Sequence, residues 1–141
     1  PVSQLDVSGY AGLKNLSVDN GAFGTAILSN NLLLETVAFT YDATYQDFSA
    51  NSLLQTINID GSSALATVTL PATNSITGIT LTGCALNVAT VNAILANARL
   101  NGMTGGTIDL SGGTSAAPTG QGILDKAYLL ATTPPNTVTT N

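Results

Sequence analysis

The chain has 141 residues, of which 44% are hydrophobic and only 8% are charged, and its net charge is −5. That length suits one domain spanning residues 1–141. The negative charge excludes an electrostatic nucleic-acid binder, which needs a basic patch. One cysteine and no histidine exclude an internal disulfide, a thiolate zinc site and a histidine-based catalytic triad. No apolar run is long enough to predict membrane insertion.

The low fraction of charged residues bears on the environment in which the protein functions. Soluble domains carry about 25% charged residues, whereas this chain relies on Thr, Ser, Asn and Gly for its polar surface. Either partner chains cover much of that surface, or the protein belongs to an extracellular or virion setting. An ordinary cytosolic monomer of unusual composition is the third interpretation.

A repeat runs along the chain. The segment 76–86, ITGITLTGCAL, fits the leucine-rich-repeat pattern L-x-x-L-x-L-x-x-N/C-x-L at every fixed position. Looser matches precede and follow it, with spacings of 21, 20, 22, 29 and 30 residues between their central residues, which are Leu16, Val37, Ile57, Ile79, Ile108 and Val138. The pattern predicts one parallel sheet in which these six side chains form an inward-facing column.

A shorter period of about 11 residues divides the early repeats. Leu5 precedes Leu16 by 11 residues, Ile27 follows Leu16 by 11, and Val68 follows Ile57 by 11. This spacing predicts a second row of strands on the opposite long side of a solenoid. The segment around Phe48 is irregular and is assigned only loosely.

The two longest repeats leave room for helices. Asn87 is a good N-cap for a helix over 88–100, in which Val88, Val91, Ile94, Leu95 and Ala98 share one face and after which Gly102 provides the stop. A second helix is expected over 122–130, before two prolines. The predicted fold is an α/β solenoid, leucine-rich-repeat-like, with β-β coils first and β-α coils with two short helices last.

Several segments resemble a known family. Residues 86–141 resemble the leucine-rich-repeat-like C-terminal domain of bacteriophage and bacterial surface proteins, through the segments 92–95, 106–114, 116–120 and 137–141. Residues 64–71, ALATVTLP, are similar to bacterial cell-surface leucine-rich repeats. The resemblance implies a structural or recognition role and carries over no catalytic residues.

Candidate chemical groups are few. The repeat frame places Asp19, Asp60 and Asp109 at one equivalent position after the strands, where stacked carboxylates could bind Ca²⁺, but turn capping is the favoured interpretation. Asp42 and Asp47 are the closest acidic pair of the irregular segment, and nothing else in the sequence supports a glycosidase pair. Cys84 is expected to turn inward as a small buried side chain. No catalytic residue, metal or cofactor is predicted.

The sharper candidate is the outward face of the main sheet. Side chains that alternate with the inward column form a flat, neutral, hydroxyl-rich surface, for which the candidate binding residues are Asn15, Ser17, Thr36, Thr56, Asn58, Thr80, Thr107 and Asp109. Solenoids commonly bind partners through such an extended face. The competing interpretation is that Thr is there for its strand propensity and solubility.

These observations and the resemblance predict a non-enzymatic phage virion protein, either a tail-fibre, tail-associated or capsid-decorating component used for assembly or host attachment. The alternative is a secreted bacterial cell-surface adhesin. A polysaccharide-degrading enzyme is disfavoured by the scattered acids. The expected location is the virion, or else the extracellular surface.

Expected partners are other virion proteins, further copies of the chain, and a host glycan or protein. Self-association is expected because a solenoid needs caps, and neither end of the sequence contains a recognisable one.

Overall fold

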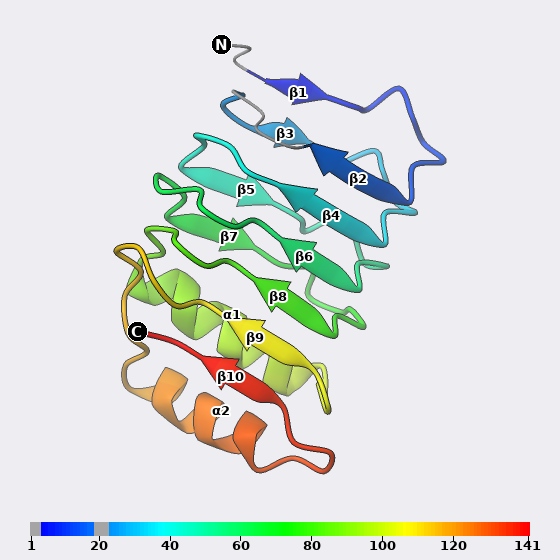
Figure 1. Ribbon diagram of the computed structural model, residues 1–141. Helices are drawn as coiled ribbons and strands as arrows, with labels where there is room; N and C mark the ends of the chain where they lie inside the picture. The colour runs from blue at the N-terminus through cyan, green and yellow to red at the C-terminus, as the bar shows by residue number, and fades with distance from the viewer. Residues whose placement is uncertain (1–3, 19–22) are drawn as a thin grey trace.

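In the computed structural model, which describes residues 4–18 and 23–141, the chain forms a solenoid of parallel strands followed by coils that contain two helices (Figure 1). The strands are β1 (Leu5–Asp6), β2 (Asn15–Val18), β3 (Ala26–Ile27), β4 (Thr36–Phe39), β5 (Tyr45–Asp47), β6 (Thr56–Asn58), β7 (Thr67–Thr69), β8 (Gly78–Thr80), β9 (Thr107–Asp109) and β10 (Thr137–Thr139). The helices are α1 (Val88–Leu100) and α2 (Gln121–Leu130). The predicted solenoid with parallel strands and two helices is therefore confirmed.

One long side of the solenoid is a six-stranded parallel sheet in the order β10-β9-β8-β6-β4-β2. The predicted column is confirmed, because every neighbouring pair is in register along the series Leu16, Val37, Ile57, Ile79, Ile108 and Val138. Five of these side chains are buried, and Leu16, on the first strand, is half-buried and packs against the same core. Period-2 alternation therefore sets which face of each strand points inward.

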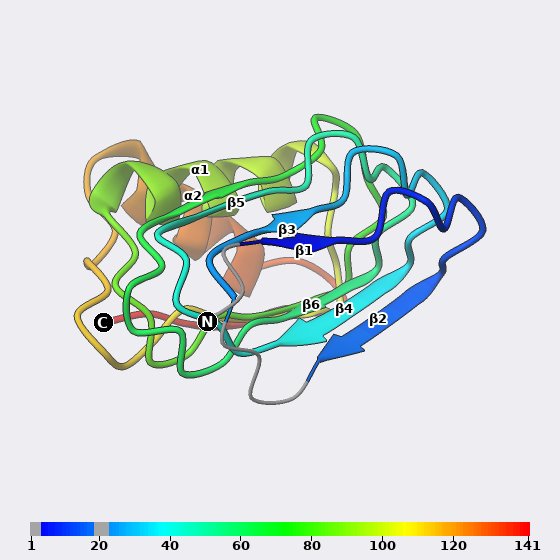
Figure 2. The ribbon, with the colours of Figure 1, turned by 90° about the horizontal axis from the view of Figure 1, so that it is seen from above.

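The opposite long side carries the pairs β1-β3 and β5-β7 (Figure 2). The 11-residue spacing correctly predicts strands on this side. It wrongly predicts Ile27 as the inward residue of β3, because the inward residue is Ala26. Leu5 is in register with Ala26, which is buried, while Ile27 is in register with Asp6 and lies half-buried on the outward side. The coil is one residue shorter at this point than a strict 11-residue period assumes.

The segment around Phe48, which the sequence assigns only loosely, contains β5. Its inward residue is Gln46 rather than an aliphatic residue, and this side chain is fully buried. Gln46 Nε2 donates to Ala26 O at 3.2 Å, and Gln46 Oε1 accepts from Ala26 N at 3.4 Å. A side-chain amide thus occupies the place where backbone pairing would join β3 to β5.

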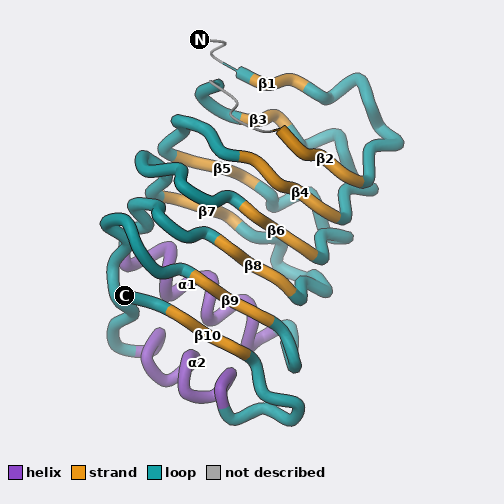
Figure 3. Tube along the Cα trace, in the orientation of Figure 1, coloured by secondary structure: helices purple, strands orange, loops and turns teal. Residues whose placement is uncertain are grey.

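The last two coils replace the second-side strands with helices (Figure 3). The predicted N-cap of α1 is confirmed, since Asn87 Oδ1 accepts from Thr90 N at 2.9 Å, and Gly102 follows the helix with φ +68°. The predicted face is correct for four of its five residues. Val88 is the error: it is 39% exposed, and Thr90 takes the buried position beside Val91.

Buried polar side chains line several turns on both ends of the solenoid's cross-section. At one turn, Asn31 Nδ2 donates to Val7 O and Tyr10 O, and Asn51 Nδ2 donates to Leu28 O and Asn31 O, at 2.8–3.0 Å. Each of these carbonyl groups also accepts a backbone N–H of its own turn, so the asparagine amide occupies its second acceptor direction. Each asparagine therefore ties its own turn to the turn of the preceding coil.

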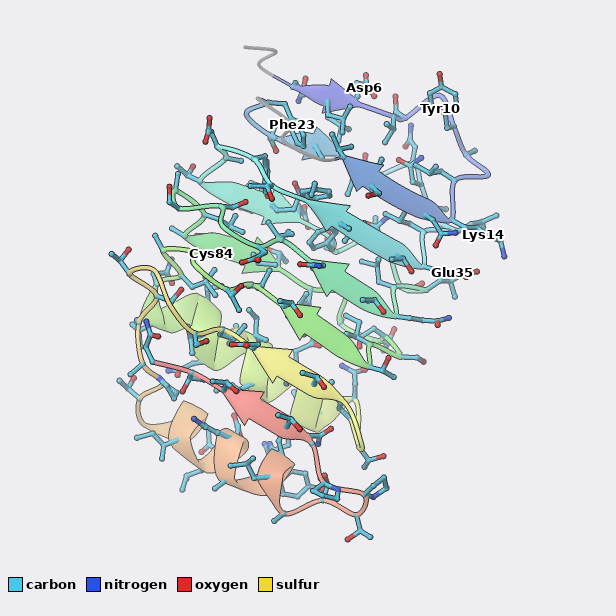
Figure 4. The ribbon with its side chains drawn as sticks, viewed as in Figure 1. Asp6, Tyr10, Lys14, Phe23, Glu35 and Cys84 are labelled. Carbon is cyan, nitrogen blue, oxygen red and sulfur yellow. The ribbon has the colours of Figure 1, made fainter. Side chains whose placement is uncertain are left out.

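The other turn uses smaller side chains for the same purpose. Tyr41 N donates to Ser62 Oγ at 3.1 Å, Cys84 Sγ donates to Ile59 O at 3.3 Å, and Ser115 Oγ donates to Cys84 O at 3.1 Å. The inward orientation expected for Cys84 is confirmed, and Figure 4 shows its position in the turn that leaves β8.

Candidate functional site

The eight predicted binding-face residues lie on the outer side of the six-stranded sheet in two columns. One column follows the register Asn15, Thr36, Thr56, Gly78, Thr107 and Thr137, and the other follows Ser17, Ala38, Asn58, Thr80, Asp109 and Thr139. All are exposed or half-buried. Neighbouring strands lie about 4.8 Å apart, and alternate residues of one strand lie about 6.6 Å apart, so the face is a regular lattice of hydroxyl and amide groups.

The charge of this face is nearly zero. Asp109 is its one charged residue, and its Oδ1 accepts hydrogen bonds from Ser111 N at 3.1 Å and Ser111 Oγ at 2.6 Å. The carboxylate therefore caps the turn after β9, as the capping interpretation of the sequence expects. The lattice suits broad, salt-insensitive polar contact rather than the focused electrostatics of a catalytic centre.

Asp60 and Asp109, which the sequence predicts to be equivalent, are not equivalent. Asp109 is in register with Thr80 and Asn58, whereas Asp60 lies two residues beyond Asn58, where its carboxylate accepts a hydrogen bond from Thr82. Asp19 lies outside the described residues. In the described part of the chain no three His, Cys, Asp or Glu side chains gather where they could hold a metal ion. The prediction is wrong because Asp109 is the last residue of β9, whereas Asp60 follows the end of β6 by two residues.

Cys84 is fully buried, and burial raises the pKa of its thiol to about 11, with a smaller contribution from the charge of Asp60. A thiol with so high a pKa is a poor nucleophile at neutral pH. The geometry gives Cys84 a role in closing the turn.

A cleft that sequence analysis missed lies on the second side, between β3 and β5. Its volume is about 200 Å³, and it is lined by Ala26, Ile27, Leu28, Ser29, Tyr45, Asp47, Ser49 and Ala50. The cleft exists because Gln46 replaces the backbone pairing of these strands. The only sequence signal was a polar residue at an inward position, in the segment that resisted assignment.

Tyr45 and Asp47 point outward from β5 at the rim of this cleft. Tyr45 is 44% exposed, and Asp47 Oδ1 accepts from Ser49 N at 2.8 Å. Partial burial raises the pKa of Asp47, but the hydrogen bonds from Ser49 and the Tyr45 hydroxyl together outweigh burial, so this pKa lies below its usual value. Asp42 lies in the loop before β5, and its backbone N donates to Phe23 O at 3.4 Å.

A larger groove, of about 480 Å³, separates β7 from α1. Hydrogen bonds from Asn87 Nδ2 to Thr67 Oγ1 at 3.2 Å and from Asn97 Nδ2 to Pro71 O at 2.8 Å span the space between the two sides of the groove. The wider diameter of a helix in place of a strand explains the gap, since a strand needs about 4.8 Å and a helix about 10 Å.

Comparison of the chain with protein-family models, with curated proteins and with solved structures finds no match. Among the described residues, no helix combines the length and apolar character needed to span a bilayer. The site must therefore be interpreted from its own residues.

Proposed function

We propose that this protein is a non-enzymatic attachment and assembly module, which contacts other surfaces through the outer face of its six-stranded sheet. The observation that carries the proposal is the pair of polar columns, which cover all six strands and hold one charged residue. A rigid, flat array of hydroxyls and amides matches an extended surface better than a small substrate.

The setting we propose is a phage virion, as a tail-fibre, tail-associated or capsid-decorating protein with a leucine-rich-repeat-like solenoid. Support comes from the low charge and from the resemblance of residues 64–71 and 86–141 to repeats of phage and bacterial surface proteins. A secreted bacterial adhesin is the alternative, and it would use the same face.

Self-association is part of the proposal, and exposed apolar side chains support it. On α2 and the end of α1 these are Leu100, Ile123, Leu124, Tyr128 and Leu130, each at least 47% exposed. At the turns before β2, β4 and β6 they are Tyr10, Leu32, Leu33 and Leu53, each at least 44% exposed. Clustered exposed apolar groups of this kind mark contact surfaces. The outer edge of β10 is also unpaired in the described sheet, and such an edge accepts a further strand.

The attachment proposal is tested with fluorescently labelled protein added to intact bacterial cells, followed by washing and measurement of the retained label. Thr56→Arg places a long cation at the centre of the face, and Ser52→Arg places the same side chain on an exposed turn outside it. We expect Thr56→Arg to reduce retention at least tenfold and Ser52→Arg to leave it within twofold. Equal retention of both variants contradicts a role for this face.

A further inference from the structure

We propose that the cleft between β3 and β5 is a binding site for a single neutral pyranose sugar, with Tyr45 as the stacking ring and Asp47 as the hydroxyl acceptor. This site lies on the side of the solenoid opposite the polar face, and it goes beyond the attachment proposal by adding a separate ligand site. Its chemistry is independent of that face, so the two proposals can fail separately.

The origin of the cleft is the first argument. β3 pairs with β1, and β5 pairs with β7, but no backbone pairing joins β3 to β5 in the described sheet. Gln46 spans the gap with its amide, bonded to both backbone groups of Ala26 and to the hydroxyl of Tyr41, which lies 3.3 Å from Gln46 Oε1. The strands are thus held apart by a fully buried and fully engaged side chain, which makes the opening a fixed feature of the fold.

The size and lining of the cleft are the second argument. Its volume of about 200 Å³ suits one sugar ring rather than a peptide or a drug-sized ligand, whose pockets measure about 300–1,000 Å³. The half-buried side chains of Ile27 and Ala50 supply apolar surface for the C–H groups of a sugar, and Ser29 and Ser49 add hydroxyls. A pyranose needs both kinds of contact, because its faces are apolar and its edge is polar.

The arrangement of the two rim residues is the third argument. Tyr45 and Asp47 are two residues apart on one strand, so both project from the same face about 6.6 Å apart. Both side chains stand on the outward side of β5, because Gln46 between them is the inward, fully buried residue of the strand. Tyr45 is 44% exposed, so its ring is available for a sugar to stack on.

The charge of the cleft is the fourth argument. The Asp47 carboxylate forms no ion pair within the described residues, where the two ion pairs are Lys14–Glu35 and Arg99–Asp125. Ser49 N occupies one lone-pair direction of Oδ1, and the Ser49 and Tyr45 hydroxyls also interact with this carboxylate, which offers about four such directions. A remaining direction can accept a sugar hydroxyl in a charge-assisted hydrogen bond.

The test is saturation-transfer NMR, followed by titration, with the methyl glycosides of glucose, galactose, mannose and N-acetylglucosamine. We expect at least one to bind, with a dissociation constant of about 1 mM, as befits a small ligand with few contacts. Tyr45→Ala and Asp47→Asn should each weaken binding at least tenfold, whereas Tyr45→Phe, which retains the ring, should weaken it less than threefold.

The matched control is Tyr10→Ala, which removes an exposed tyrosine (69% exposed, against 44% for Tyr45) from a turn outside the cleft. It should leave sugar binding unchanged, and circular dichroism melting curves should show that all four variants fold. Absence of binding by all four glycosides overturns the proposal, as does an equal effect of Tyr45→Ala and Tyr10→Ala. Binding of lysine amide in place of the sugars also overturns it, because that result identifies a cation site.

The two proposals are separated by crossing their variants. Thr56→Arg should abolish cell retention without changing sugar affinity if both are correct. If the protein binds a sugar but Thr56→Arg leaves cell retention unchanged, only the polar-face proposal is rejected. If Thr56→Arg reduces cell retention but the protein binds none of the sugars, only the cleft proposal is rejected.

Discussion

Arg99 of α1 and Asp125 of α2 form an ion pair across the helix interface, with Arg99 Nε 2.8 Å from Asp125 Oδ1. Their environments differ sharply, because the Arg99 side chain is 38% exposed and the Asp125 side chain is 1% exposed. Gln121 Nε2 donates to the same Oδ1 at 3.0 Å, and the guanidinium carbon lies 5.9 Å from the centre of the Tyr128 ring. The carboxylate therefore depends on its partner more than the guanidinium does.

This asymmetry predicts unequal effects of removing the two charges. Arg99→Ala leaves a buried carboxylate with one remaining donor, which should cost about 3 kcal/mol of unfolding free energy. Asp125→Asn keeps an oxygen acceptor for Gln121 and lets Arg99 turn to water, so it should cost about 1 kcal/mol. Urea unfolding of both variants measures the difference. Equal losses would show that the pair contributes through packing rather than charge.

The alternation in β6 predicts opposite outcomes for adjacent substitutions. Ile57→Asp buries a carboxylate in the core without a partner and should cost several kcal/mol, about 4 or more. Asn58→Asp places the same group on the polar face and should change stability by about 0.5 kcal/mol or less. Thermal melting of the two variants checks this, and similar melting temperatures would contradict the assignment of faces.

Two glycines with similar backbone angles separate strain from steric clash. Gly102 has φ +68° and open space around the position of a Cβ, whereas at Gly113, with φ +57°, a Cβ would lie 2.2 Å from Cys84 O. Gly102→Ala should lower the free energy of unfolding by about 1–2 kcal/mol, because only the left-handed backbone conformation is strained there. Gly113→Ala should cost at least about 2 kcal/mol more, because a backbone carbonyl must move. Denaturant unfolding gives both values, and equal costs would show that the turn after β9 adjusts freely.

The raised pKa of Cys84, about 11 in the folded protein against an ordinary value of 9.0, predicts a loss of stability in alkali. Below pH 9 the thiol is neutral in both states and favours neither. Between pH 9 and 11 the unfolded chain loses the proton first, so the free energy of unfolding falls by at most about 2–3 kcal/mol. Cys84→Ala removes this component, so comparing the pH dependence of the two proteins isolates it. Parallel curves would contradict the assignment.

The proposed self-association can be tested by measuring the oligomeric state of the chain in sedimentation experiments. At micromolar concentration the chain should sediment as an oligomer, and it should remain one as salt rises, because apolar contacts and strand pairing are weakly screened. Leu124→Glu, on the exposed side of α2, should shift the distribution toward monomer. A monomer in both low and high salt would contradict the assembly proposal.

The main sheet was predictable because its inward residues are aliphatic and its repeat spacing stays at 20–22 residues until the helices lengthen it to 29 and 30. The same logic failed in β5, since Gln46 reads as an outward residue by polarity. It is buried only because Ala26 of the preceding coil offers both backbone groups to its amide. No local pattern reveals a bond between residues 20 positions apart.

The candidate sites divide in the same way. Alternation alone placed the threonines and asparagines of the polar face, but the cleft at Tyr45 arises from a missing strand pairing, which the sequence does not display. The mistaken equivalence of Asp60 and Asp109 arises from a shift of two residues, because Asp109 lies inside β9 and Asp60 lies beyond the end of β6.

The asparagines at the turns have a consequence for how the protein can change in size. Asn51 bonds only to its own coil and the coil before it, so each coil carries the groups needed to accept another of the same kind. Inserting a second copy of residues 37–56 should lengthen the solenoid by about 4.8 Å, the spacing of neighbouring strands. The length of the solenoid can therefore change in fixed steps of one coil, either during evolution or by protein engineering.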